Sequence, residues 1–244
     1  MALADQAVIV TGGGSGIGQA VCRALGAAGA RVVVADLAAE LAEATAGEVA
    51  AAGGRALAVP VDVAEPASVQ QLVDRTVAAH GAVDALVHCA GITRYDDVLE
   101  MPVETWDRII AVNLRGTFLC TQAVLRQMVP RRQGRIVLFA SQRGVDGQVR
   151  GSHYAASKGG VIAFMRSVAQ EMAPHGIAVN AVAPGTTNTA MWRGTKSAAE
   201  IERELQSGRI GAPEEAIGMV LMLLGDDARR VTGQLIMRRV RMPD

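Results

Sequence analysis

The sequence predicts an α/β fold, a doubly wound parallel β-sheet of about seven strands flanked by helices, with residues 1–244 in a single domain. Seven short, continuous apolar runs recur along the chain, as expected for parallel strands that are covered on both faces. Between these runs, apolar residues recur at steps of three and four, which is typical of amphipathic helices. No Pro-, Gly- or Ser-rich linker, charge block or internal repeat interrupts the pattern, so the sequence predicts no domain boundary.

Each element is predicted from its own residues. The expected strands are Ala7–Val10, Val32–Ala35, Ala56–Val61, Ala85–Val87, Ile136–Ala140, Ile177–Ala183 and Leu235–Met237. Two helical stripes are especially regular, one of Ile17, Val21, Leu25 and Ala28 and the other of Val161, Met165, Val168 and Met172. Because strands and helices alternate, right-handed crossovers should place the strands parallel in one sheet.

The charge balance does not indicate a nucleic-acid partner. The chain carries 24 Lys and Arg and 24 Asp and Glu, so it has no global basic footprint. Short basic runs such as Arg131-Arg132 are interpreted as solvated or interfacial arginines. The N-terminal residues lack a secretory signal, and no stretch approaches the ~18 uncharged apolar residues that span a bilayer. We therefore expect a soluble, cytoplasmic protein with no membrane partner.

Cysteine and histidine spacing does not predict a metal site. Cys22, Cys89 and Cys120 are widely separated and lie in apolar runs, and no Cys-x-x-Cys or Cys/His ligand spacing occurs. We interpret them as small buried thiols. The four histidines also lack ligand spacing, so no metal is expected.

A glycine-rich loop between the first strand and the first helix predicts a Rossmann-type dinucleotide site. The segment Thr11-Gly12-Gly13-Gly14-Ser15-Gly16-Ile17-Gly18 has the spacing G-x-x-x-G-x-G rather than G-x-G-x-x-G. Its backbone can turn sharply, approach a pyrophosphate closely and present helix N-terminal amides to that charge. The residues expected to bind the dinucleotide here are Gly12, Gly14, Ser15, Gly16, Ile17 and Gly18.

An acid at the end of the second strand predicts NAD rather than NADP. Asp36 can accept hydrogen bonds from the adenosine ribose hydroxyls and would repel a 2′-phosphate. No Lys or Arg occurs at positions 37 to 39. The alternative is that Asp36 caps the following helix. Asp62-Val63, after the third strand, is the expected adenine contact, with a plain turn aspartate as its alternative.

Tyr154, Lys158 and Ser141 predict acid–base catalysis at the carboxyl edge of the sheet. Tyr154 and Lys158 lie four residues apart in a helical segment, so they share one face, and Ser141 ends the fifth strand. A lysine cation and an oxidised nicotinamide would lower the ordinarily high pKa of the tyrosine phenol. Ser141 would hydrogen-bond the reacting oxygen, and a buried Asn113 could hold a water that relays the proton.

With these motifs in order, residues 5 to 234 resemble the short-chain dehydrogenase/reductase family, in its compact single-domain branch. The resemblance rests on TGGGSGIG, Asp62-Val63, the Cys89-Ala90-Gly91 turn, Asn113, Ser141, Tyr154-x-x-x-Lys158, and Pro184-Gly185 with Thr189. It implies a catalytic tetrad of Asn113, Ser141, Tyr154 and Lys158. Further cofactor contacts are implied for Ala90, Gly91, Tyr154, Lys158, Pro184, Gly185 and Thr189. It also implies a homo-oligomer, usually a tetramer, with a dimer as the alternative.

Two departures from the family pattern stand out. Cys89 replaces the Asn of the usual Asn-Ala-Gly turn, which ties neighbouring strands in the family. After Thr232-Gly233-Gln234 the chain reads LIMRRVRMPD instead of running into Asp-Gly-Gly. The first departure bears on local stability or cofactor fit, and the second on subunit contacts and the edge of the substrate pocket.

Substrate specificity is expected to come from the irregular segments 92–97, 142–153 and 186–207. Trp192 either lines a mobile lid over the substrate or packs on the domain. The polar residues Gln142, Arg143, Gln148, Arg150 and His153 suit a hydroxylated or anionic substrate, and solvent-facing or interfacial side chains explain them equally well.

Two further resemblances differ in what they imply about the reaction. Ala90 to Arg94 and Val179 to Met191 resemble 3-oxoacyl-carrier-protein reductases, which usually prefer NADPH. Gly147 to Arg150 resembles NAD-linked sugar-acid and polyol dehydrogenases. Because of Asp36, we expect an NAD-dependent enzyme that interconverts a secondary alcohol and a ketone. The alternatives are a 3-oxoacyl-carrier-protein reductase-like ketoreductase and a non-catalytic dinucleotide-sensing protein.

Overall fold

The computed structural model describes residues 3–194 and 196–238, and it contains one seven-stranded sheet. Its strands are β1 (Ala7–Thr11), β2 (Arg31–Asp36), β3 (Arg55–Pro60), β4 (Ala85–His88), β5 (Gly134–Phe139), β6 (Ile177–Ala183) and β7 (Leu235–Met237). The order is β3-β2-β1-β4-β5-β6-β7, and every neighbouring pair is parallel. All seven predicted strands and the doubly wound α/β fold are confirmed.

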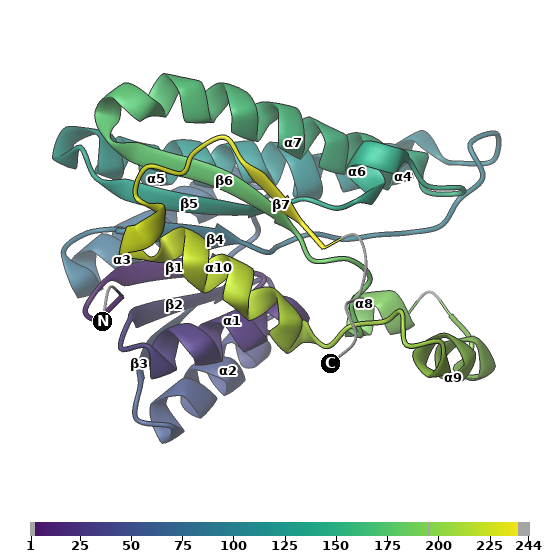
Figure 1. Cartoon of the computed structure of the whole chain (residues 1–244), viewed down its shortest axis with the longest axis horizontal. Coiled ribbons are helices and arrows are strands. Elements are labelled where there is room, and N and C mark those ends of the chain that lie inside the picture. The colour runs from purple at the N-terminus through teal and green to yellow at the C-terminus, as the bar shows by residue number, and fades with distance from the viewer. Residues whose placement is uncertain (1–2, 195, 239–244) are drawn as a thin grey trace.

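Helices cover both faces of this sheet (Figure 1). The α-helices are α1 (Gly16–Ala27), α2 (Ala39–Ala51), α3 (Pro66–His80), α4 (Val103–Ile110), α5 (Gly116–Arg131), α6 (Arg143–Asp146), α7 (Ser152–Met172), α8 (Ala190–Arg193), α9 (Ala198–Gln206) and α10 (Ile217–Leu224). Shorter turns are η1 (Ala111–Arg115), which is a π-helix, and the 3-10 segments η2 (Ala173–His175), η3 (Pro213–Ala216) and η4 (Asp226–Ala228).

The two faces of the sheet form two apolar cores. On one face, Ile9 and Val33 pack with residues of α3, α5 and α7, including the fully buried Leu72 and Met165. On the other face, Val8, Val10, Val32 and Val34 pack with residues of α1, α2 and α10. Successive strand residues therefore point into opposite cores, which explains why the strands are apolar without interruption.

The direction in which successive strands are added to the sheet reverses between β1 and β4, although all of these strands run parallel. From β1 the strand order runs outward through β2 to β3, and from β4 it runs the other way through β5 and β6 to β7. Loops leaving the carboxyl ends of β1 and β4 therefore separate, and such a switch point is where open α/β sheets bind ligands.

The last strand, β7, lies at one edge of the sheet. The predicted strand Leu235–Met237 is present as β7, and it pairs with β6, for example through Ala181 and Leu235. Residues 239–244 of the unusual tail lie outside the described residues. In the described part of the chain, no helix combines the length and apolar character that crossing a membrane requires.

Candidate active site

Two adjoining cavities lie at the carboxyl edge of the sheet. The first, of about 640 Å³, contains Ser141, Tyr154 and Lys158 in its wall, and we call it the substrate cavity. The second, of about 340 Å³, contains the glycine-rich loop and Asp36, and we call it the dinucleotide cavity. Ile17, Cys89, Gly91, Phe139, Thr189 and Met191 line both. The shared wall makes one elongated site.

The glycine-rich loop is built from backbone conformations that favour glycine. Gly12 and Gly16 have φ of 65° and 55°, in the left-handed region. A Cβ on Gly18 would lie 2.0 Å from the carbonyl oxygen of Gly12, so helix α1 starts in direct contact with the loop. Ser15, at the N-cap of α1, makes no side-chain capping bond and lines the dinucleotide cavity. The N-terminal amides of α1 are thus close to that cavity, as a pyrophosphate requires.

Asp36 lies at the end of β2 and lines the dinucleotide cavity. Its Oδ2 accepts a hydrogen bond from the Gly14 amide at 2.9 Å, and its Oδ1 accepts one from the Ala38 amide at 3.1 Å. The carboxylate is therefore held in place by both neighbouring loops. Among the described residues, Gly14 belongs to neither cavity wall and instead contacts Asp36, so it supports the site from behind.

The loops after β3 and β4 complete the dinucleotide cavity. Asp62 and Val63 line it, and the Asp62 carboxylate also accepts a hydrogen bond from the Ala64 amide, so the turn role that sequence alone left open is present as well. Ala90 and Gly91 line the cavity beside Gly12. A Cβ on Gly12 would lie 2.8 Å from the Ala90 nitrogen, which explains the close approach of these two loops.

Cys89 stands at the junction of the two cavities. Its amide donates to the Thr11 carbonyl at 3.1 Å, so the turn continues the pairing of β4 with β1 through the backbone. Burial raises the pKa of the Cys89 thiol, which disfavours the thiolate. The strand connection that the family makes with an Asn is made here by main-chain atoms and by Thr11, whose hydroxyl shares a 2.8 Å hydrogen bond with His88 Nδ1.

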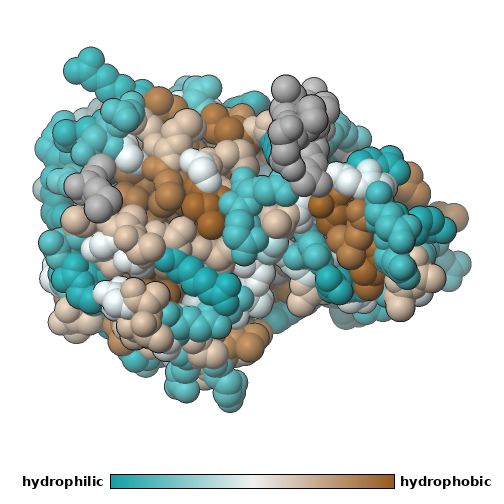
Figure 2. Space-filling model, turned by 60° about the horizontal axis from the view of Figure 1, so that its bottom comes forward, coloured by the Kyte–Doolittle hydropathy of each residue, from teal (hydrophilic) through white to brown (hydrophobic). Residues whose placement is uncertain are grey.

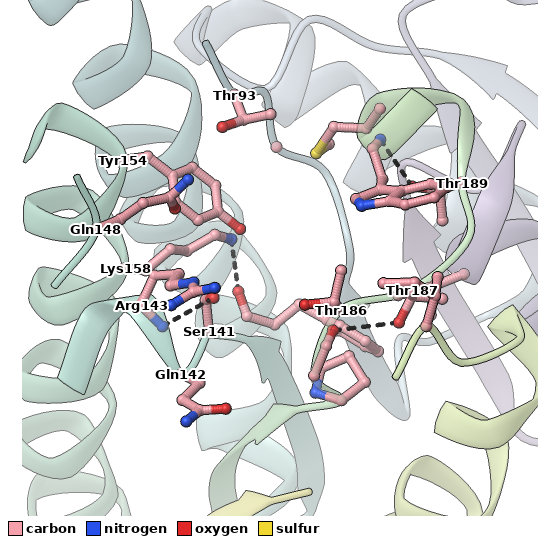
Figure 3. Close-up of a pocket in the computed structure, with 18 of the residues that line it drawn as sticks. Thr93, Ser141, Gln142, Arg143, Gln148, Tyr154, Lys158, Thr186, Thr187 and Thr189 are labelled. Carbon is pink, nitrogen blue, oxygen red and sulfur yellow. Dashed lines mark hydrogen bonds between the residues drawn. The ribbon is translucent and has the colours of Figure 1, made fainter. Parts of the chain in front are cut away.

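Ser141, Tyr154 and Lys158 come together on one side of the substrate cavity (Figure 3). Ser141 follows β5, and its hydroxyl accepts a hydrogen bond from the Arg143 amide at 3.2 Å. Lys158 Nζ donates to the Phe139 carbonyl at 2.6 Å and lies 5.9 Å from the centre of the Tyr154 ring. One turn of α7 therefore places phenol and ammonium on the same face, as the four-residue spacing predicted.

Neighbouring protein groups shift the pKa of the Tyr154 phenol both upward and downward. Burial is the largest effect and raises the pKa of the Tyr154 phenol, while a hydrogen bond with Ser141 and the charge of Arg143 lower it. The net shift from these protein groups is upward. The lowering expected from the lysine cation together with an oxidised nicotinamide stays a prediction. Burial also lowers the pKa of Lys158 to about 8, which leaves this side chain mainly cationic at neutral pH.

Asn113 lies behind the cavity wall in the π-helix η1, fully buried. Its Oδ1 accepts from the Ile92 amide at 2.8 Å, and its Nδ2 donates to the Ile92 carbonyl at 2.9 Å and to Ser157 Oγ at 3.1 Å. Both amide protons are thus directed at protein atoms. The water relay proposed from the sequence stays a prediction, and the observed contacts tie the loop after β4 to α7.

The segment after β6 forms the opposite wall of the substrate cavity. Pro184 and Gly185 line it, and Gly185 has φ of 83°. Thr189 caps α8 by accepting from the Trp192 amide, and its methyl group approaches Gly16. Trp192 is 9% exposed and lines the cavity. It therefore serves both as packing and as an apolar part of the cavity wall.

The five polar residues singled out in the sequence divide into two groups. Gln142, Arg143 and Gln148 line the substrate cavity, whereas Arg150 and His153 do not. Arg150 pairs with Asp97 at 3.3 Å, and buried His153 has its Nε2 3.6 Å from Asp96. Sequence reasoning missed the cations Lys196, Arg203 and Arg209 in the opposite wall. The only signal for them was their position within or just after the segment 186–207.

Within residues 3–194 and 196–238, no three His, Cys, Asp or Glu side chains gather as a metal site would require. The arrangement instead combines a backbone cradle for a dinucleotide with a Ser, Tyr and Lys cluster.

These features agree with the comparisons to known proteins. The chain belongs to the short-chain dehydrogenase family, whose model matches residues 6–200. It is therefore an oxidoreductase that acts on CH–OH groups. It is 41% identical to 3-oxoacyl-[acyl-carrier-protein] reductase of Synechocystis sp., over 96% of this chain and 95% of that protein. It is 38% identical to L-rhamnose 1-dehydrogenase (NAD(P)(+)) of Azotobacter vinelandii, over 96% and 94%. Its fold matches the crystal structure of a short-chain type dehydrogenase/reductase from Mycobacterium marinum with a TM-score of 0.90, 34% identity and coverage of 96% and 94%.

Proposed function

We propose that the chain catalyses NAD-dependent interconversion of a secondary alcohol and a ketone, with Tyr154 as the acid–base group. The observation that carries this proposal is the placement of Ser141, Tyr154 and Lys158 in a cavity that shares a wall with the glycine-rich loop and Asp36. A nicotinamide dinucleotide fits the residues present, because the amides at the start of α1 and the carboxylate of Asp36 lie on one elongated site.

When bound, a nicotinamide dinucleotide would supply or accept the hydride, while side chains of the protein would donate or accept the proton. Ser141 and Tyr154 are positioned to donate hydrogen bonds to a carbonyl oxygen between them. A phenol whose pKa is raised by burial stays protonated, so Tyr154 suits the role of acid in ketone reduction. Lys158, mainly cationic at neutral pH, supports the phenolate that remains and would hold the nicotinamide ribose. Asn113 acts as a positioning residue, through Ile92 and Ser157.

Residues of the two cavities would hold the dinucleotide in sequence along the sheet edge. Gly12, Ser15, Gly16, Ile17 and Gly18 would bind the pyrophosphate, with Gly14 holding Asp36 in place. Asp36, Asp62, Val63 and Ala90 would contact the adenosine half, and Gly91, Pro184, Gly185 and Thr189 the nicotinamide half.

The choice of NAD over NADP rests on Asp36. Its carboxylate is fixed by two amide hydrogen bonds at the cavity wall, so a 2′-phosphate would meet an anion that cannot easily move away. We expect the dissociation constant of NADPH, measured by its fluorescence, to exceed that of NADH by about 100-fold, on the order of 3 kcal/mol. Asp36→Ser should reduce this ratio at least tenfold. Equal affinity for NADH and NADPH in the unaltered protein would contradict the assignment.

A 3-oxoacyl-carrier-protein reductase is the second candidate, favoured by the 41% identity to the Synechocystis sp. reductase. A sugar or polyol substrate is favoured by the 38% identity to L-rhamnose 1-dehydrogenase. Absorbance at 340 nm discriminates between them. Oxidation of NADH by a short 3-oxoacyl thioester supports the reductase. Reduction of NAD⁺ by a polyol or sugar acid, with no turnover of the thioester, supports the dehydrogenase.

We also propose that the chain forms one domain, works in the cytoplasm and assembles into a homo-oligomer. Self-association is supported by exposed large apolar side chains on α4 and α5, with Val103 69%, Trp106 39% and Phe118 41% exposed. Figure 2 shows a further apolar area on the molecular surface. On α10, Met222 is 49% exposed. Light scattering after size exclusion should give the mass of a tetramer or dimer, and a monomer would contradict the proposal.

A further inference from the structure

The walls of the substrate cavity carry a strong excess of positive charge. Among the described lining residues there are five Lys or Arg side chains and one carboxylate, that of Glu204. The cations are Arg143, Lys158, Lys196, Arg203 and Arg209. Because the whole chain has no net charge, this excess is a local property of the site and not a reflection of composition.

Among the described residues, only one of these cations, Lys196, forms an ion pair with a carboxylate. Lys196 Nζ lies 2.8 Å from Glu204 Oε1, and it also lies 5.7 Å from the centre of the Trp192 ring. Within the described part of the chain, no carboxylate lies within 4.0 Å of Arg143, Arg203 or Arg209 in an ion pair. The guanidinium groups facing the cavity therefore have donors left for a ligand.

Arg143 lies next to the reacting groups. Its own amide donates to Ser141 Oγ at 3.2 Å, and Figure 3 shows its guanidinium beside Ser141 and Lys158. Among the described residues, Asp146 of the same short helix forms no ion pair with Arg143, and its Oδ2 accepts a hydrogen bond from Gln142 Nε2 at 2.8 Å. Arg143 thus lines the cavity beside Ser141, one of the two residues that would hold the reacting oxygen.

We propose that the substrate carries an anionic group, a carboxylate or a phosphate, that Arg143 binds while Ser141 and Tyr154 hold the reacting oxygen. This inference rests on the proposed function and narrows it to keto and hydroxy acids or their phosphate counterparts. The planar guanidinium matches two anionic oxygens at once, which fixes the orientation of a small substrate as well as its affinity. Arg203 and Arg209 line the same cavity and would add further attraction for an anion.

The first test compares matched probes with saturating NADH. Acetoacetate is paired with its neutral ester, ethyl acetoacetate, and dihydroxyacetone phosphate with neutral dihydroxyacetone. We expect the anionic member of one pair to have a kcat/KM at least tenfold higher, and the pair that shows this identifies carboxylate or phosphate. Equal or better turnover of the neutral member in both pairs would overturn the proposal.

The second test assigns the preference to Arg143. Arg143→Met removes the charge with little loss of volume and should lower the ratio of kcat/KM between anionic and neutral probe by 10- to 100-fold, as expected for a hydrogen-bonded ion. Arg143→Lys should restore part of it. Because the ratio compares two probes on the same catalytic groups, changes in folding or in Tyr154 acidity cancel. The control Arg75→Met, an exposed arginine of α3 outside both cavities, should leave the ratio unchanged. A ratio unaffected by Arg143→Met overturns the assignment.

A third measurement separates this proposal from the proposed function, because it needs no turnover. The complex of the protein with NADH is titrated with malonate, inorganic phosphate and neutral malonamide, and NADH fluorescence is followed. Tighter binding of an anion than of malonamide, lost in Arg143→Met, supports the anion site even if no ketone is reduced. Turnover of ketones together with equal binding of all three probes would retain the oxidoreductase function and overturn the anion site.

Discussion

The two cavities of this protein have opposite charge and are built in different ways. The dinucleotide cavity is lined by two carboxylates, Asp36 and Asp62, and one guanidinium, Arg108, among the described residues. The substrate cavity is lined by five cations and one carboxylate. The chain has no net charge, yet negative charges predominate in one cavity and positive charges in the other. The acidic lining supports the proposed exclusion of a 2′-phosphate, and the basic lining supports the proposed anionic substrate.

Their construction differs in the same way. The dinucleotide cavity is formed by strand ends and by close backbone contacts, such as Gly12 against Ala90 and Gly18 against Gly12. Half of the substrate cavity is formed by the segment with α8 and α9, which lies apart from the body of the sheet (Figure 1). The lesson is that sheet topology positions a site, whereas irregular segments decide which molecule it accepts. Substitutions in the two cavities should therefore have separable effects on turnover and on dinucleotide binding.

Tyr154→Phe should show most clearly that turnover and dinucleotide binding depend on different cavities. The phenyl ring keeps the shape of the cavity but cannot donate a proton, so we expect turnover to fall at least 10³-fold, about 4 kcal/mol in the barrier. The dissociation constant of NADH should change less than threefold. Absorbance at 340 nm and NADH fluorescence measure the two effects. Tyr95→Phe, which alters the other tyrosine of the cavity wall, should retain most of the turnover, and loss in both variants alike would contradict the role of Tyr154.

Gly18→Ala should act on the dinucleotide cavity alone. The new Cβ would lie 2.0 Å from the Gly12 carbonyl oxygen, so the loop must shift. We expect the dissociation constant of NADH to rise at least tenfold and the free energy of unfolding to fall by about 1–3 kcal/mol. Gly47→Ala in α2 is the matched control, because nothing lies within 4 Å of its Cβ and Ala is the better helix former. Unchanged NADH affinity in Gly18→Ala would show that the loop adapts freely.

His88 should make the sheet beneath the dinucleotide cavity sensitive to acid. Burial and the charge of Lys158 lower the pKa of His88 to about 3, from an ordinary value of 6.5. The unfolded chain therefore binds the additional proton first, and stability that is present above pH 6.5 is lost as the pH falls toward 3. The slope from this group is about 1.4 kcal/mol per pH unit. His88→Asn can keep the hydrogen bond with Thr11. In this variant the urea-unfolding midpoint should change less with pH between pH 4.5 and 6.5 than in the unaltered protein. Parallel profiles for both proteins would refute this cause.

Cys89→Asn should have the smallest effect, although it restores the residue typical of the family. The strand connection at this turn is already made by the Cys89 amide and the Thr11 carbonyl. We expect turnover and NADH affinity to stay within about threefold and the melting temperature to move by a few degrees. A tenfold gain in NADH affinity would instead show that the cysteine limits cofactor fit.

Much of the dinucleotide cavity could be predicted from the sequence. Glycine is needed where φ is positive or where a Cβ would clash with the backbone. Gly12, Gly16 and Gly18 meet these conditions and could therefore be predicted from the sequence. The shared face of Tyr154 and Lys158 could also be predicted, because a helix brings residues four positions apart to one face. Continuous apolar runs likewise predicted every strand of the sheet.

Only the tertiary structure decided the charge of the substrate cavity, the contacts of Asn113 and the net direction of the Tyr154 pKa. Arg143 faces cations from Lys196 to Arg209, many residues away in sequence, because the segment after β6 lies across the cavity. Arg150 and His153 belonged to the same polar set in the sequence, but Arg150 pairs with Asp97 and His153 lies 3.6 Å from Asp96, both outside the substrate cavity. Local backbone geometry depends on neighbours in the chain and can be inferred from residue type. Burial and charge pairing depend on long-range packing, which no local pattern encodes.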